Sequence, residues 1–168
     1  MSLPRFFIPE YVTAQQVVQL DEDASRHIVQ VLRMRRGEAL QLTDGAGHLL
    51  TAVVEDDHKK HCTVLIQEVK YNQRNGRRVS IGISLLKNAN RFEWFLEKAT
   101  ELGVSAIIPL LCERTEKEKF RFDRLRGITV SAMLQSQQCW LPVLHQPVSY
   151  DLLFRNEEVA SASAKLIA

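Results

Sequence analysis

The 168-residue sequence has no hydrophobic run long enough to cross a bilayer. Its longest apolar stretches, such as residues 107–112, are far shorter than the roughly 20 residues that a membrane helix requires. The first residues, Met1 to Arg5, also lack the apolar core of a secretory signal. We therefore expect a cytoplasmic protein that has no membrane partner.

Cysteine is scarce, and its spacing excludes two kinds of cross-link. The three cysteines, Cys62, Cys112 and Cys139, lie far apart in apolar surroundings without a C-x-x-C pair. Neither a disulfide framework nor a zinc site is indicated, and buried thiols are expected. The pair His58 and His61 encloses two lysines that would repel a cation. We expect a solvated turn there and no metal ion.

Four familiar catalytic signatures are missing. The sequence contains no G-x-G-x-x-G, no G-x-x-x-x-G-K-[ST], no H-E-x-x-H and no G-x-S-x-G. Classical dehydrogenases, P-loop NTPases, zincins and α/β-hydrolases therefore lose support. A nucleophile and base brought together only by folding remain possible, because neighbours in space need not be neighbours in sequence.

The net positive charge of the chain is small, but its basic residues are clustered. A net charge of +2 does not by itself establish nucleic-acid binding, which requires concentrated positive potential. Basic residues gather at residues 33–36, 74–78 and 121–126, each at or beside a predicted turn or helix start. Such clusters bind phosphate in some proteins and form solvated faces in others, so charge alone leaves both interpretations open.

Composition is that of a globular protein, with 45% hydrophobic and 25% charged residues. Up to residue 71, short β-rich segments alternate with turn residues. One helical segment, residues 25–34, interrupts them after an acidic start that suits the helix dipole. The expected strands cover residues 17–20, 39–43, 49–55 and 62–69. A small β-barrel over residues 1–71 is the predicted arrangement.

The pattern changes after a polar, turn-rich linker at residues 72–78. From residue 79 to 168, strands and helices alternate, which predicts a parallel sheet in an α/β domain. The expected strands cover residues 79–86, 104–111 and 142–145, with a further one beginning at 163–168, and the expected helices cover residues 90–102 and 123–137. Because such sheets typically contain about five or six strands, the α/β domain is predicted to be incomplete.

Cationic side chains follow the first two strands of this α/β domain. Lys87 and Arg91 come after the first, and Arg114 after the second. Open α/β sheets bind ligands at the carboxyl edge, so these cations are candidates to neutralise RNA phosphate or a ligand carboxylate. Surface solubilisation is the alternative.

Two further sets of residues, a pair of glutamates and a glutamine-rich segment, each have a functional and a structural interpretation. Glu97 and Glu101 are like charges one helical turn apart, which is unfavourable unless a cation such as Arg114 pairs with them; simple exposure is the alternative. Gln135 and its neighbours beside Trp140 offer amides and a ring suited to an unpaired base. A helix end next to a buried tryptophan is the favoured interpretation.

Several motifs, taken in order, resemble the 16S ribosomal RNA uridine-N3 methyltransferase family. The most specific are E-K-A-T-E-L-G-V at residues 97–104 with E-R at 113–114, and H-I-V-Q-V-L-R at residues 27–33. R-F-F at residues 5–7, R-F-E-W at 91–94, Pro109, S-A-M-L-Q-S at 131–136 and Pro142 complete the series. The resemblance covers nearly the whole chain.

The resemblance implies a fold, a cofactor and partners. These are a PUA-like RNA-binding β-barrel followed by a SPOUT-type α/β-knot methyltransferase domain, S-adenosylmethionine as methyl donor, and 16S ribosomal RNA or the small ribosomal subunit as substrate. The full-length form is expected to be a homodimer with a trefoil knot, a rare exception to the rules of chain threading.

The resemblance also implies roles for individual residues. It puts Arg5, His27 and Arg33, with Arg35 and Arg36 of the same basic cluster, on the RNA-facing half. It puts Lys87, Arg91 and Arg114 at the catalytic cleft, supported by Glu97, Lys98, Glu101 and Gln135. We expect Arg114 or Arg91 to stabilise negative charge that develops on the base. The sequence shows no convincing general base.

The sequence departs from the family at its end. The family's Gly-Pro-Glu-Gly-Gly loop and a later Leu-Arg-Thr-Glu-Thr-Ala-like segment are expected beyond Ala168, and with them the cofactor-binding residues. We therefore expect this chain to be a truncated, inactive form of the enzyme. One alternative is a non-catalytic RNA-binding module. Another is a metabolic α/β enzyme, which would show no salt-sensitive affinity for structured RNA.

Overall fold

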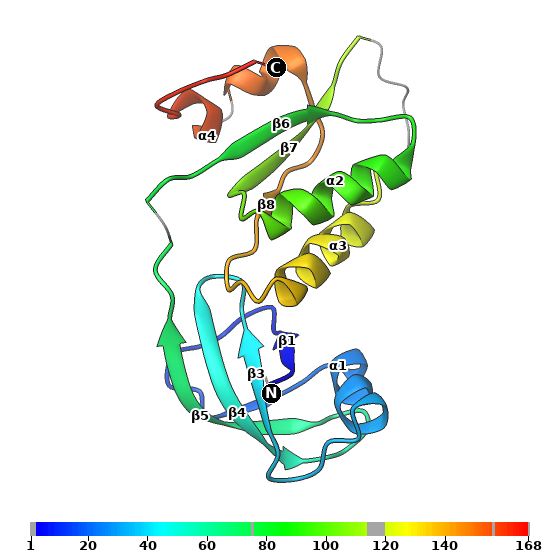
Figure 1. The fold of residues 1–168 in the computed structure, drawn as a ribbon, viewed down its shortest axis with the longest axis vertical. Coiled ribbons are helices and arrows are strands. Elements are labelled where there is room, and N and C mark those ends of the chain that lie inside the picture. Colours follow the sequence, from blue (N-terminus) through cyan, green and yellow to red (C-terminus); the bar gives the residue numbers. More distant parts are fainter. Residues whose placement is uncertain (1–2, 75, 114–119, 156, 168) are drawn as a thin grey trace. The chain divides into compact units, whose positions relative to one another are not determined.

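The computed structural model describes residues 3–74, 76–113, 120–155 and 157–167. The chain divides into two compact units (Figure 1). The first unit contains Met1–Arg74 together with Gln137–Trp140, and the second contains Asn75–Ser136 and Leu141–Ala168. Among the described residues, no helix is long and apolar enough to span a membrane.

The first unit is built on a five-stranded sheet in the order β1-β3-β4-β5-β2. The strands are β1 (Arg5–Phe7), β2 (Val17–Gln19), β3 (Ala39–Thr43), β4 (His48–Asp56) and β5 (Thr63–Tyr71). β1 runs parallel to β3, and the other pairs are antiparallel. The four predicted strands are confirmed. β1 was not predicted, because its three residues are too few to show alternation.

Alternating apolar residues of this sheet form the first core. Leu40 and Leu42 of β3 and Leu50 and Ala52 of β4 are fully buried. Fully burying a leucine contributes about 1.5–3 kcal/mol, so this one face supplies much of the unit's stability. Register shifts between β4 and β5, one of them at Thr51/Ala52, interrupt the ladder, and such irregularities bend strands. The result is the curled, half-barrel sheet that the β-barrel prediction requires.

The helical segment of the first unit differs from the prediction. It comprises α1 (Glu22–Arg26) and one π-helical stretch, η1 (His27–Val31), rather than residues 25–34. Asp21 caps α1, since its Oδ1 accepts from the backbone N of Ala24 at 2.7 Å. The acidic residues thus form the first turn of α1 instead of preceding it. Arg33 adopts a left-handed φ of 57°, which ends the helix early.

The second unit contains a parallel sheet with β7 (Ala106–Leu111) at its centre. β6 (Ser80–Ser84) pairs with one edge of β7. β8 (Val143–Leu144) pairs with the beginning of β7, and β9 (Val148–Ser149) pairs with its end. The three predicted internal strands are confirmed. β9 was not predicted, because it has two residues and directly follows Pro147, which has no N–H to donate.

Two long helices cover one face of this sheet (Figure 1). α2 (Ala89–Glu101) and α3 (Phe122–Gln135) lie within about two residues of their predicted bounds. Their apolar sides share the second core with the sheet, formed by Phe92, Leu96, Ala99, Val104, Ile107, Leu125 and Leu144.

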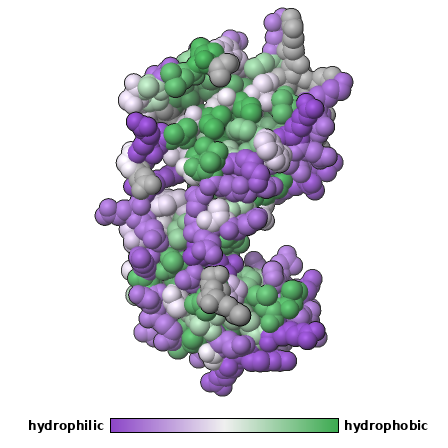
Figure 2. Space-filling view, in the orientation of Figure 1, coloured by the Kyte–Doolittle hydropathy of each residue, from purple (hydrophilic) through white to green (hydrophobic). Residues whose placement is uncertain are grey.

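A 3-10 helix, η2 (Tyr150–Arg155), and a short helix, α4 (Glu157–Ala160), follow β9. Leu153 of η2 packs near Gly82 of β6, where an added Cβ would lie 3.7 Å from it. Hydrophobic surface gathers over β6 and η2 (Figure 2). The strand predicted to begin at residues 163–168 is wrong over the described part: Leu166 and Ile167 are 96% and 89% exposed and pair with no strand.

Leu96 and Leu102 provide a matched test of the second core. Leu96 on α2 is fully buried, whereas Leu102, directly after the same helix, is 86% exposed. We expect Leu96→Ala to lower the free energy of unfolding by about 2–5 kcal/mol, because it removes buried methyl groups and leaves a cavity. Leu102→Ala should change it by less than about 0.5 kcal/mol. Urea denaturation measures both, and equal effects would contradict the assigned core.

Candidate functional site

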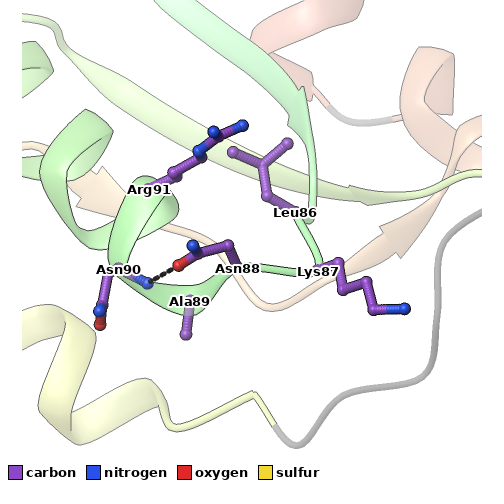
Figure 3. A pocket seen from close by; sticks show the side chains of 6 residues that line it. All are labelled: Leu86, Lys87, Asn88, Ala89, Asn90 and Arg91. Carbon is purple, nitrogen blue, oxygen red and sulfur yellow. Dashed lines mark hydrogen bonds between the residues drawn. The ribbon is translucent and has the colours of Figure 1, made fainter.

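A pocket opens where β6 ends and α2 begins. The chain leaves the carboxyl end of β6 at Ser84 and enters α2 at Ala89. The pocket has a volume of about 650 Å³ (Figure 3). It is lined by Leu86, Lys87, Asn88, Ala89, Asn90 and Arg91. The structure therefore brings two of the three predicted catalytic cations, Lys87 and Arg91, to one pocket. Arg114 lies outside the described residues.

Asn88 fixes the beginning of α2 at this pocket. Its side-chain Oδ1 accepts from the backbone N of Asn90 at 3.0 Å, and its carbonyl accepts from the backbone N of Arg91 at 3.1 Å. The side chains of Arg91 and Leu86 extend toward each other, while that of Lys87 extends away from them (Figure 3). Two cations at the positive end of a helix dipole favour an anion, such as a phosphate. Asn88 was not predicted as the N-cap of α2, although asparagine is a preferred capping residue and the N-A-N sequence could have indicated it.

Lys98 explains how α2 tolerates two nearby carboxylates. Its Nζ lies 2.8 Å from Glu97 Oε1 and 3.0 Å from Glu101 Oε2, and all three side chains are partly exposed. The hydrogen bonds that Lys98 donates to Glu97 and Glu101 raise the pKa of Lys98 above its ordinary value. A cation partner for both carboxylates thus comes from α2 itself, and the predicted pairing with Arg114 lies outside the described residues. At 1.5 Å per residue, Glu101 lies about 15 Å along the helix from Arg91.

Gln135 lies far from this pocket. Arg124 Nε donates to Glu93 Oε1 at 2.7 Å, so the first turns of α2 and α3 lie together. Gln135 is the last residue of α3, about 20 Å along the helix from its beginning. The predicted supporting residues Glu97, Lys98, Glu101 and Gln135 therefore lie toward the C-terminal ends of α2 and α3, away from this pocket. Their role in catalysis remains a prediction.

The Glu93–Arg124 ion pair gives a pH-dependent prediction. Hydrogen bonding to Arg124 lowers the pKa of Glu93. A carboxyl whose folded pKa lies below its unfolded value of about 4.3 stabilises the fold above that pH. This contribution is lost as the pH falls through the lower folded pKa.

We therefore expect Glu93→Gln to reduce the melting temperature at pH 7 and to have almost no effect at pH 2. Thermal unfolding monitored by circular dichroism at both pH values is the measurement. Glu55→Gln, an exposed carboxylate of the first unit, is the matched control. A Glu93→Gln effect independent of pH would assign the loss to packing instead of charge.

In the first unit, four of the five predicted RNA-binding residues are exposed on and after η1. They are His27, Arg33, Arg35 and Arg36. We call residues 33–36 the basic loop. Arg35 is partly engaged, because its Nη1 lies 3.2 Å from Asp57 Oδ2. The π-helical geometry of η1 is typical of functional positions, and the exposed cations suit phosphate contacts.

Arg5, the fifth, has structural partners. Its side chain is half-buried, and its Nη2 and Nε donate to Gln41 Oε1 at 3.0 and 3.3 Å. Its Nη1 donates to the carbonyl of Gln137. Arg5 thereby holds the segment Gln137–Trp140 against the sheet of the first unit. Its contact with RNA stays a prediction.

Trp140 and the cysteines have the structural roles that the sequence analysis favoured. Trp140 is half-buried, and its Nε1 donates to the carbonyl of Asn72 at 2.9 Å. The cysteines are free thiols; Cys62 and Cys139 are buried and Cys112 is partly so. Burial, followed by the charges of Asp56 and Asp57, raises the pKa of Cys62 to about 11, so this thiol is a poor nucleophile. Over the described part of the chain, no three potential metal ligands come together.

The fold and the cationic pocket define a class of protein: a β-rich unit with exposed cations followed by a parallel α/β unit with a cationic carboxyl edge. Residues 73–168 match the sequence model of the RNA methyltransferase domain, and residues 20–67 match that of the RNA methyltransferase PUA domain. The first match covers more than half of the chain. The chain therefore belongs to the RNA methyltransferase domain family.

Relatives and solved structures are consistent with this membership. The chain is 30% identical over 145 residues to the ribosomal RNA small subunit methyltransferase E of Synechocystis, covering 84% of this chain and 46% of that protein. It is 28% identical to the protein of the same name from Mycobacterium tuberculosis, covering 96% and 64%. The chain thus spans about half to two-thirds of the length of these relatives.

Two solved structures share the fold. A probable rRNA methyltransferase from Porphyromonas gingivalis superimposes with a TM-score of 0.82 at 35% identity, over 90% of this chain and 63% of that one. The ribosomal RNA small subunit methyltransferase E of Neisseria gonorrhoeae, bound to S-adenosyl methionine, gives a TM-score of 0.77 at 30% identity, over 88% and 62%. The predicted fold class is confirmed.

Proposed function

We propose that the protein to which this chain belongs methylates N3 of a uridine in 16S ribosomal RNA, with S-adenosylmethionine as the methyl donor. The observation that carries the proposal is the order of two family matches, a PUA part followed by a methyltransferase part, over a chain that has a pocket lined by Lys87 and Arg91 in the second part. The names of the relatives supply the ribosomal substrate, and the Neisseria structure supplies the cofactor.

In this proposal the two units have different tasks. The exposed cations of the basic loop bind RNA phosphates, which position the substrate without reading its sequence. Lys87 and Arg91 bind a phosphate or stabilise negative charge on the uridine carbonyls when N3 loses its proton. Holding the base in line with the donated methyl group supplies most of the rate enhancement. Arg114 has the same proposed role as Arg91.

The described pocket does not fit the cofactor itself. Its charged side chains are both cations, which repel a sulfonium, and it offers one exposed leucine in place of an apolar slot for an adenine ring. We therefore assign the pocket to the RNA. The cofactor-binding residues are proposed to lie beyond Ala168, in the part of the relatives that this chain does not span.

We also propose the domain boundaries, the oligomeric state and the cellular location of the full-length protein. The domains are residues 1–71 and 79–168, joined by a linker at 72–78. The full-length protein is a homodimer. It acts in the cytoplasm, where ribosomal RNA is assembled into subunits.

The product of the native gene tests the function. It would be incubated with small ribosomal subunits that lack the modification and with S-adenosylmethionine carrying a labelled methyl group. We expect label in 16S ribosomal RNA, recovered as 3-methyluridine after digestion to nucleosides. Label on another base, or on another nitrogen or carbon of uridine, would overturn the assignment.

The second candidate is the RNA-binding module, favoured by the compact first unit with its exposed cations. It predicts that residues 1–168 bind ribosomal RNA with salt-sensitive affinity but bind no S-adenosylmethionine. Calorimetric titration of the cofactor into this chain and into the native product separates the two. Heat of binding only with a longer native product supports the methyltransferase. No binding by either supports the module.

A further inference from the structure

Aromatic side chains form a row at the end of the first unit's sheet where β4 begins and β5 ends. His48 of β4 stands directly opposite Tyr71 of β5. The ring of His48 lies 5.3 Å from that of Tyr11 and 5.1 Å from that of Tyr71, and Tyr71 lies 6.0 Å from Trp140. The guanidinium of Arg74 lies 5.0 Å above the Trp140 ring. We call these five residues the aromatic row.

Asp44 fixes the imidazole in this row. Its Oδ2 lies 2.6 Å from His48 Nδ1, and its Oδ1 accepts from the backbone N of Ala46 at 2.8 Å and of His48 at 3.2 Å. The Asp44 side chain is only 7% exposed. A carboxylate held in this way orients the imidazole ring and accepts a hydrogen bond from the proton on Nδ1. The other ring nitrogen, Nε2, is then the atom that can bond to a further partner.

The side chains of the aromatic row are more exposed than those of the adjacent hydrophobic core. Leu50 is fully buried, yet its cross-strand partner Val69 is 42% exposed and Tyr71 is 54% exposed. Tyr11, His48 and Trp140 are half-buried. Partly exposed rings, a stacked guanidinium and an oriented imidazole thus lie side by side in a part of the first unit that is fixed by hydrogen bonds.

The row is remote from the basic loop. β4 has nine residues, which span roughly 25 Å at about 3.4 Å per residue. His48 begins this strand, whereas Arg35 pairs with Asp57, just beyond its other end. The match to the PUA domain, residues 20–67, includes His48 but not Tyr11, Tyr71, Arg74 or Trp140.

We infer that the aromatic row is a second RNA-binding surface, which stacks unpaired bases and is separate from the phosphate-binding basic loop. The inference rests on the proposed RNA substrate. Proteins bind unpaired RNA by stacking its bases on aromatic rings and guanidinium planes, whereas bases inside a duplex are already stacked and unavailable. Arg74 supplies a cation for the backbone charge, and the aligned His48 supplies one hydrogen-bonding nitrogen.

Binding of the 168-residue chain to two labelled RNAs tests the inference by fluorescence anisotropy. One is an unpaired oligonucleotide of about 12 nucleotides, within the site sizes known for single-strand binding, and the other is a perfect duplex of equal length. Tyr71→Leu should bind the unpaired RNA about 5- to 100-fold more weakly and the duplex with unchanged affinity. Tyr71→Phe, which keeps the ring, should bind as the wild type does.

Tyr150→Leu is the matched control, because Tyr150 is a similarly exposed tyrosine of the second unit, 44% exposed. It should leave both affinities unchanged. The double variant Arg33→Ala/Arg36→Ala tests the proposed function separately and should weaken both RNAs through lost phosphate contacts. If neither RNA binds the wild-type chain, the proposed function fails. If the double variant weakens binding and Tyr71→Leu does not, only the present inference is overturned.

Two measurements keep the test decisive if Tyr71→Leu folds poorly or acts through another partner. The wild-type chain, irradiated with an unpaired RNA that contains 5-iodouridine, should cross-link at Tyr71 or His48 when its peptides are sequenced. Cross-links confined to other residues would overturn the inference. The inference would also be overturned if sedimentation showed that Tyr71→Leu changes a dimer to a monomer, because the ring would then belong to a protein interface.

Discussion

Gly47→Ala is expected to lower the free energy of unfolding of the first unit by about 2–5 kcal/mol. Gly47 has a φ of +101°, and an added Cβ would lie 2.6 Å from Trp140 Cζ2 and 2.9 Å from Tyr71 Cε2. The backbone conformation and the two rings both oppose a side chain there. Urea denaturation followed by tryptophan fluorescence measures the loss.

Gly37→Ala separates the two causes. Gly37 has a similar φ of +90°, but a Cβ there would meet nothing within 4 Å. Its substitution should therefore cost only the backbone term, about 1–2 kcal/mol. Equal losses for the two variants would show that the rings yield easily, and would contradict the tight contact between Gly47 and Trp140.

Arg91→Ala is expected to reduce methyl transfer by the native gene product about 100-fold, the size of effect seen when one charge-stabilising donor is removed from an active site. Arg91 lines the pocket at the carboxyl edge, and its exposed side chain has no share in the core. The melting temperature should therefore be unchanged. A fall in kcat would assign Arg91 to the charge on the base, whereas a rise in KM alone would assign it to a phosphate of bound RNA.

Arg155→Ala is the matched control for Arg91→Ala, because Arg155 is an exposed arginine of the same unit that lies in η2. Its activity should stay within about twofold of the wild type, as for most surface substitutions. Activity of Arg91→Ala equal to that of Arg155→Ala would remove Arg91 from the proposed site and leave Lys87 and Arg114 as the remaining candidates.

The sequence predicted those elements whose own pattern determines them. α2 shows apolar residues at helical spacing and ends before Gly103, and it was placed almost correctly. β7 has six residues, five of them buried, and its apolar run was sufficient. The candidate cations Lys87 and Arg91 line one pocket, because the carboxyl end of a strand and the beginning of the next helix are adjacent in the chain; their catalytic role stays a prediction.

The features that were not predicted depend on contacts between residues that are far apart in the sequence. β1 and β9 are two or three residues long and exist only because β3 and β7 pair with them. The hydrophobic period of residues 25–34 continued past the point where Arg33 takes a left-handed φ. The aromatic row combines residues from four separate segments, so no motif could have indicated it. Gln135 was associated with the cleft by resemblance; it lies at the end of α3 away from the pocket of Lys87 and Arg91, and its role stays a prediction.

The four residues Gln137–Trp140 have a consequence for how the protein is made. They belong to the first unit although more than sixty residues of the second unit separate them from Arg74. A ribosome that adds about 5–20 residues per second needs several seconds to cover that distance. During this interval the nascent sheet lacks the carbonyl of Cys139 as acceptor for Gly47 N and the indole that donates to Asn72. The first unit thus finishes folding only after all of α3 has been synthesised.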